Sequence, residues 1–155
     1  MPLILSFSSL VVRATRSETA APAFSAKSEA VFLASERRKQ VHIDQMKAAL
    51  NDFEMHISSG ENDGTVKADY DFHIAIAEAS ANQYFVDFLK YLGEKIIPRA
   101  RVKSIEQSPE NREEYLKAVH HDHVNIFNAI VDQDGLLARQ MMRAHLSKSI
   151  KKFKQ

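Results

Sequence analysis

The sequence predicts an all-α protein, an antiparallel bundle of about six helices. Only four glycines and four prolines occur in 155 residues, which is few for a chain of many strands and turns. From about residue 26 onward, apolar residues recur at three- and four-residue intervals, the spacing of an amphipathic helix. No segment competes with a clear alternation of polar and apolar residues, so helices account for the whole pattern.

The first 25 residues differ from the remainder, and we expect an N-terminal segment of residues 1–25 and a helical domain of residues 26–155. Residues 1–12 are apolar but far shorter than the ~20 residues that span a bilayer, so no membrane association is expected. No positive charge precedes this run, as it would in a secretory signal. Residues 14–25 have the composition of a linker, in which Pro22 should interrupt any helix.

Charge and cysteine content exclude several classes of protein. The chain has 21 Lys plus Arg against 20 Asp plus Glu, so it lacks the basic excess of an autonomous nucleic-acid binder. There is no cysteine, which excludes disulfides, thiolate metal sites and cysteine nucleophiles. The absence of cysteine also fits a reducing compartment, and we expect a cytoplasmic location.

The first helices are expected over residues 26–38 and 42–58. Their apolar stripes contain Ala30, Leu33 and Ala34, and then Ile43, Met46, Leu50 and Phe53. The basic run of residues 37–39 is interpreted as a solvated helix end rather than a DNA contact. A loop at residues 59–65, marked by Gly60 and Gly64, precedes a helix from about Val66 to Ala79.

The remaining helices are bounded by caps and prolines. Asn82 should cap a helix with a core-like stripe of Phe85, Phe88, Leu89, Leu92 and Ile96. Pro98 should kink or end that helix. Ser108 followed by Pro109 predicts a helix start, with the helix reaching about Val131. Asp134 can cap the last helix, which should extend to about Lys152.

Asp69 and His73 are the most informative pair of residues in the chain. They are four residues apart, so on a helix they share one face with Val66, Phe72 and Ile76. An ionised carboxylate on such an apolar face must be paired or bound to a metal, because its desolvation is otherwise too costly.

Two further histidines are expected to point inward. His123 occupies a position in an apolar stripe where the helical spacing calls for another apolar residue. His145 shares a helix face with Ala138 and Met142. One carboxylate and three imidazoles suit a first-row divalent metal, with zinc expected first and nickel, manganese or iron as alternatives. A buried hydrogen-bond network is the competing interpretation.

The other histidines carry weaker signals. We interpret His42, His56 and His121 as surface residues. His120 lies one turn before His123, where it could support a ligand or simply flank it.

Taken together, these residues resemble the FCD ligand-binding domain of GntR-type bacterial transcriptional regulators. The resemblance covers about three quarters of the chain and is carried by Asp69-x-x-Phe72-His73, then Asn82, then His123-x-x-Ile126-x-x-Ala129-Ile130-x-x-x-Asp134-x-x-x-Ala138-x-x-x-Met142-x-x-His145-Leu146. It implies a helical bundle with a central cavity that binds a divalent metal and a small carboxylate effector, and that forms a homodimer. In such a domain the metal ligands would be Asp69, His73, His123 and His145.

Regulators of this type carry a winged helix-turn-helix before the ligand domain, and residues 1–25 are too short to encode one. We therefore expect no direct DNA binding by this chain. Cations near the metal would complete recognition of an organic acid through charge-assisted hydrogen bonds. Arg99 and Arg101 are the candidates for effector binding, and Asn82 is a third, although a capping role suits it better.

Three functions remain open on the sequence. The leading hypothesis is a metal-dependent sensing domain for an organic acid, without catalysis of its own. The second is a metal-dependent hydrolase, for which Asp71 or Glu78 would be the base, although helical spacing directs both away from the ligand face. The third is a structural helical dimerisation module with a buried polar network.

Overall fold

The computed structural model describes residues 20–104 and 109–154, and every regular element within them is helical. The helices are α2 (Ala20–Arg37), α3 (Gln40–Ser59), α4 (Asn62–Ala79), α5 (Gln83–Ser104), α6 (Pro109–Val131) and α7 (Gly135–Lys154). The predicted all-α class is therefore confirmed. None of the helices in the described ranges is long and apolar enough to cross a bilayer.

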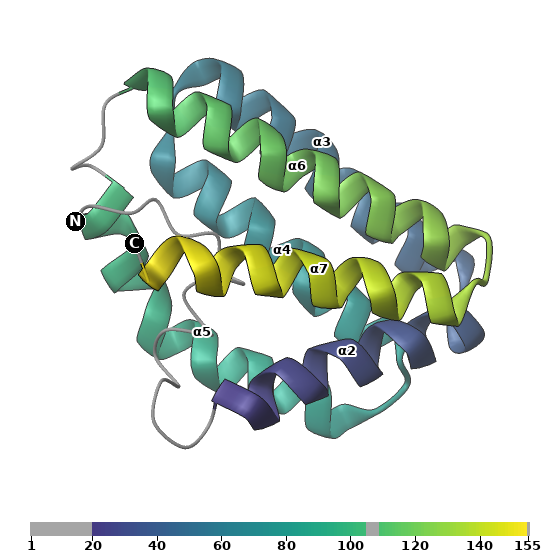
Figure 1. Cartoon of the computed structure of the whole chain (residues 1–155). Helices are drawn as coiled ribbons and strands as arrows, with labels where there is room; N and C mark the ends of the chain where they lie inside the picture. The colour runs from purple at the N-terminus through teal and green to yellow at the C-terminus, as the bar shows by residue number, and fades with distance from the viewer. Residues whose placement is uncertain (1–19, 105–108, 155) are drawn as a thin grey trace.

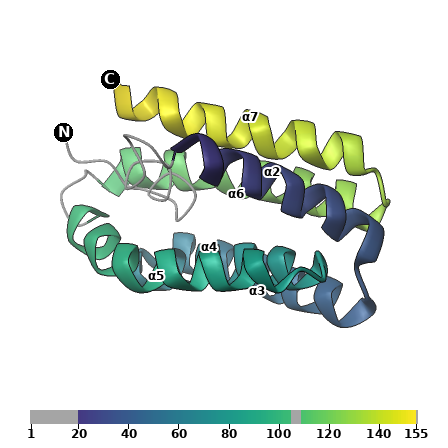
Figure 2. The ribbon, with the colours of Figure 1, turned by 90° about the horizontal axis from the view of Figure 1, so that it is seen from below.

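The helices form two layers (Figure 2). One layer contains α2, α6 and α7, and the other contains α3, α4 and α5. Short connections make α3 and α4, α4 and α5, and α6 and α7 neighbours, while α2 packs along α7 (Figure 1). The apolar stripes of both layers meet in a main core, which includes Val31, Met46, Phe72, Ile126 and Met142. The space between the layers is therefore where any inward polar side chain must lie.

Two predicted helix boundaries were wrong, the starts of α2 and α4. Helix α2 already begins at Ala20, so Pro22 lies in its first turn, where the missing N–H of proline breaks no helical hydrogen bond. Helix α4 begins at Asn62 rather than near Val66, which shortens the preceding loop. At Pro98 the prediction left a kink or a helix end open, and the second alternative is excluded because α5 continues to Ser104.

Predicted caps and turns are present at three other boundaries, whereas the predicted cap at Ser108 lies outside the described residues. Gly60 ends α3 with φ of 76°, a left-handed conformation that glycine adopts without steric cost. The Asn82 Oδ1 atom accepts a hydrogen bond from the Tyr84 N–H over 3.1 Å at the start of α5. The Asp134 Oδ1 atom accepts a hydrogen bond from the Leu137 N–H over 3.0 Å at the start of α7. These side chains satisfy N–H groups that have no partner within the helix.

The basic run of residues 37–39 has a structural role that the sequence did not suggest. Arg38 is half-buried and donates hydrogen bonds to the carbonyl oxygens of Ile130, at 3.0 Å, and Val131, at 2.6 Å. Arg37 donates to the Ser80 carbonyl oxygen at 3.0 Å. The interpretation as a solvated helix end therefore fits the exposed Arg37 and Lys39 but not the half-buried Arg38. Both arginines satisfy carbonyl groups at the ends of α6 and α4.

Candidate metal centre and adjoining pocket

Four polar side chains converge in the space between the two layers. Helix α4 supplies Asp69 and His73, α6 supplies His123 and α7 supplies His145. All four are buried, and the exposed fractions of Asp69 and His123 are both 0%. The predicted inward orientation is thus confirmed. Each of these residues occupies a position within the apolar stripe of its own helix.

The distances within this cluster are short. Asp69 Oδ1 lies 3.2 Å from Nε2 of His123 and 3.5 Å from Nε2 of His73. One nitrogen from each of His73, His123 and His145 lies within 4.8 Å of the others. The three imidazoles could therefore hold one metal ion, with the Asp69 carboxylate directly beside them.

Aromatic side chains fix the position of the central imidazole. The ring of Phe72 stacks on His123 with centroids 4.7 Å apart, and Phe53 meets the same imidazole edge-on at 5.7 Å. Phe53 also stacks on His120 at 5.8 Å. His120 is half-buried and does not belong to the cluster of candidate ligands, so it flanks the site through Phe53.

The protonation states of the buried imidazoles suit metal ligation. Burial lowers the pKa of His73 well below its usual value, and the positive charges of Lys27 and His145 lower it further. Burial likewise lowers the pKa of His123, followed by the charges of His145 and His73. Both imidazoles are therefore neutral near pH 7, and the neutral form has the lone pair that a metal requires.

His145 is oriented by a carboxylate that the sequence did not single out. Its Nδ1 atom lies 3.1 Å from Asp122 Oδ2, and Lys148 Nζ lies 2.9 Å from the other oxygen of that carboxylate. Burial would raise the pKa of Asp122, but the hydrogen bonds from His145 and Lys148 outweigh it and lower the pKa. An ionised Asp122 accepts a hydrogen bond from the Nδ1–H of His145, which leaves Nε2 of His145 as the ligating nitrogen.

The donor set fits a divalent metal ion. Both ring nitrogens of His123 are buried and make no hydrogen bond among the described residues, which is unusual for a structural histidine. Histidine and carboxylate donors suit zinc, and they also suit nickel, manganese and iron. The carboxylate that supports His145 is the kind of partner that metal-ligating histidines commonly have.

Lys27 is a buried residue near this cluster that sequence reasoning missed. It lies on α2 with 4% of its surface exposed. Burial lowers its pKa to about 8, while the negative charge of Asp69 acts in the opposite direction. The signal was present in the sequence, because Lys27 precedes Ala30 and Ala34 by three and seven residues and so shares their buried face.

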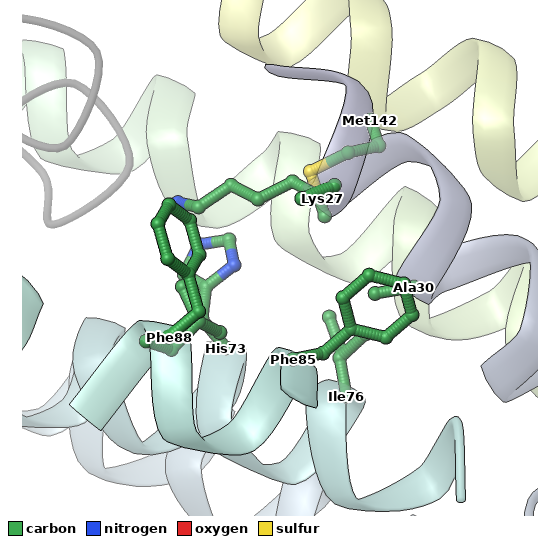
Figure 3. A pocket seen from close by; sticks show the side chains of 9 residues that line it. Lys27, Ala30, His73, Ile76, Phe85, Phe88 and Met142 are labelled. Atoms are coloured by element: carbon green, nitrogen blue, oxygen red, sulfur yellow. The ribbon is translucent and has the colours of Figure 1, made fainter. Parts of the chain in front are cut away.

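A narrow pocket adjoins the cluster on the side of His73 (Figure 3). Its wall comes from α2, α4, α5 and α7 and consists of Ala26, Lys27, Ala30, His73, Ile76, Phe85, Phe88, Leu89 and Met142. The amino group of Lys27 and the ring of His73 lie together at one end, next to Phe88. The pocket therefore combines a polar end at a candidate metal ligand with an apolar remainder.

None of the predicted effector residues is among the described residues that line this pocket. Asn82 lies at the start of α5 as a helix cap and lines a different groove. The side chains of Arg99 and Arg101 lie outside the described residues, so their predicted role stays a prediction. Asp71 and Glu78, the bases considered for a hydrolase, line a separate groove between α3 and α4.

Comparison with known proteins identifies the family. The FCD domain family matches residues 27–148. The HTH-type transcriptional regulator LutR of Bacillus subtilis (strain 168) is 27% identical over 124 residues, which cover 74% of this chain and 51% of that protein. The chain thus spans about half the length of this curated relative.

A solved structure supports the same assignment at the level of the fold. The structure of E. coli McbR/YncC superposes with a TM-score of 0.73, at 15% identity, over 86% of this chain and 65% of that chain. At this identity the likeness concerns the helical bundle alone. Together with the family match, it confirms the resemblance on which the sequence interpretation was based.

Proposed function

Because the chain belongs to the FCD domain family, the ligand-sensing domain of GntR-type regulators, we propose that it senses a small carboxylate in a metal-dependent manner. The observation that carries the proposal is the meeting of Asp69 with His73, His123 and His145 in the buried centre of the bundle. Burying these groups without a function would be costly.

Asp69, His73, His123 and His145 would hold the metal, with zinc expected first and nickel, manganese or iron as alternatives. A bound divalent metal would supply positive charge and open coordination positions for the oxygens of an organic acid. The pocket at His73 would widen to receive the acid, because it leads to a candidate ligand and combines Lys27 with otherwise apolar side chains.

The signal would pass to transcription through a homodimer. LutR is a transcriptional regulator by name, and by similarity we propose the same role for the protein to which this domain belongs. Acid binding would favour one arrangement of the two ligand domains, and so one spacing of the DNA-binding domains linked to them. The described helices would not contact DNA themselves.

Metal content and thermal unfolding test the proposal. We expect His123→Ala and His145→Ala each to reduce the zinc stoichiometry of the purified chain and to lower its Tm, since a metal that binds only the folded state stabilises it. His121→Ala is the matched control, because His121 is exposed on the same helix as His123. Unchanged stoichiometry in either ligand variant would refute the metal assignment.

A screen of small organic acids tests the sensing role. We expect acids to raise the Tm of the zinc-loaded protein and to have little effect after chelator treatment. Equal shifts with and without metal would contradict metal-dependent sensing. We propose no catalytic role, because the considered bases Asp71 and Glu78 line another groove. Turnover of an acid ester or amide by the zinc-loaded protein would contradict that part of the proposal.

A further inference from the structure

The pocket beside His73 has an uneven distribution of polarity. Of the described residues that line it, only Lys27 and His73 carry polar side chains. The others include Phe85, Phe88 and Leu89 of α5. A ligand that widens this pocket can therefore place one polar group at the end where Lys27 and His73 meet, while its remainder contacts carbon (Figure 3).

Lys27 brings a positive charge to that polar end. Lysine is rarely buried, because removing an ammonium group from water is costly unless an anion lies close to it. For Lys27 the negative charge of Asp69 offsets only part of that cost, since burial still lowers the pKa of Lys27. Its side chain extends from α2 across the pocket so that the amino group lies beside the His73 ring (Figure 3). A carboxylate at this position would reach the ammonium group of Lys27 and the candidate metal centre at His73 together.

We propose that Lys27 is the residue that binds the carboxylate of the effector, and that the pocket selects small monocarboxylates with an apolar remainder over dicarboxylates. This inference rests on the proposed sensing function and names the class of acid that the same site recognises. It assigns to Lys27 the role that sequence reasoning gave to Arg99 and Arg101.

Selection against a second carboxylate follows from the apolar walls. A dicarboxylate with one carboxylate at Lys27 would place the other among Ile76, Phe85 and Leu89. Within the described lining, no further basic side chain is available there to compensate its charge. Its desolvation would therefore oppose binding, whereas a methyl group at the same position would be favourable.

The matched probes are 2-hydroxybutanoate and malate, which differ only in a terminal methyl group against a terminal carboxylate. Titration calorimetry with the zinc-loaded full chain should show tighter binding of 2-hydroxybutanoate, by at least about 10-fold. Lys27→Met should weaken 2-hydroxybutanoate binding about 10- to 100-fold, because a hydrogen bond to a charged group is lost. Its zinc stoichiometry should remain that of the wild type.

Two further variants complete the experiment. Lys27→Arg keeps the positive charge and should retain more affinity for 2-hydroxybutanoate than Lys27→Met does. Lys47→Met is the matched control, because Lys47 is exposed on α3 and is not among the residues that line the pocket. The comparison of the two acids uses the wild-type chain alone, so it tests the proposal even if a Lys27 variant does not fold.

The outcomes separate this inference from the proposed function. Zinc-dependent binding of 2-hydroxybutanoate that is unchanged in Lys27→Met would overturn the role of Lys27. Zinc-dependent binding in which malate equals or exceeds 2-hydroxybutanoate would overturn the selection of monocarboxylates. Both results would leave metal-dependent sensing intact. A wild-type chain that takes up zinc but binds neither acid would overturn this inference alone, whereas a chain that takes up no zinc would overturn the proposed function and this inference with it.

Discussion

Asp122 and His145 join α6 to α7 through a contact of 3.1 Å between a carboxylate oxygen and Nδ1 of the imidazole. Asp122 immediately precedes His123, so one turn of α6 contributes both a candidate ligand and the residue that orients another. The carboxylate selects the tautomer in which Nε2 of His145 has a free lone pair. The geometry of the candidate metal centre therefore depends on a residue that would not itself touch the metal.

Replacing this carboxylate should weaken metal binding without removing a ligand. We expect Asp122→Asn to reduce zinc affinity by about 10- to 100-fold, because the amide no longer stabilises the required tautomer of His145. Competition with a chromophoric chelator measures the effect. Glu114→Gln, an exposed carboxylate change on the same helix, should leave the affinity unaltered. Equal zinc affinities for Asp122→Asn and the wild type would show that His145 is oriented by other contacts.

Phe72 should matter for both stability and metal affinity. Its ring packs on His123 at 4.7 Å and belongs to the main core. We expect Phe72→Leu to lower the free energy of unfolding by about 1–2 kcal/mol through lost packing and ring stacking. Zinc affinity should also fall, since His123 would be held less firmly.

Ile130→Val provides the comparison for this effect. Ile130 lies in the same core, and the change should cost about 0.5–1.5 kcal/mol. Denaturant unfolding and zinc titration of both variants distinguish a general loss of stability from a local effect on the imidazole. If the two substitutions changed zinc affinity equally, the stacking contact would have no specific role.

Arg38 should stabilise the bundle rather than bind a ligand. Its guanidinium group donates to the carbonyl oxygens of Ile130 and Val131 at the end of α6. We expect Arg38→Met to lower the free energy of unfolding by about 1.5–3 kcal/mol, because charged hydrogen bonds are lost at a helix terminus. Arg143→Met, at an exposed position on α7, should have little effect. Chemical denaturation measures the free energy of unfolding of both variants. If Arg38→Met lost affinity for zinc or for an acid under conditions where it is fully folded, Arg38 would have a role in the site.

The turn between α3 and α4 should require glycine at residue 60. A Cβ atom would meet no neighbour there, so the cost of a substitution comes from the backbone φ of 76° alone. We expect Gly60→Ala to reduce stability by about 1 kcal/mol and Gly60→Asn to reduce it less, because asparagine tolerates the left-handed region. Equal Tm values for the wild type and Gly60→Ala would show that the turn adopts another conformation.

Periodicity was sufficient to predict most of the fold and the candidate ligands. His123 lies three residues before Ile126 and seven before Ile130, so its burial follows once these apolar residues face the core. On α4, Asp69 likewise lies three residues before the buried Phe72 and so faces the core with it. Boundaries were harder, as the early start of α2 shows, because a proline is compatible both with a linker and with the first turn of a helix.

Contacts between helices could not be predicted in the same manner. The pairing of Asp122 with His145 joins residues 23 positions apart, and Arg38 reaches carbonyl groups more than 90 positions away. Both depend on how two helices are rotated and shifted along each other. The partner of a charged residue beside an apolar stripe cannot be predicted until the packing of the two helices is known.

The sequence by itself determined which residues of each helix face inward, because helical geometry relates their positions through a short repeat. It therefore determined the helical class and the burial of Asp69, His73, His123 and His145. Only the tertiary structure decided that these side chains meet between the layers, that Asp122 supports His145, and that Lys27 shares a pocket with His73. Those relationships arise from the packing of separate helices, which a repeat along one helix does not specify.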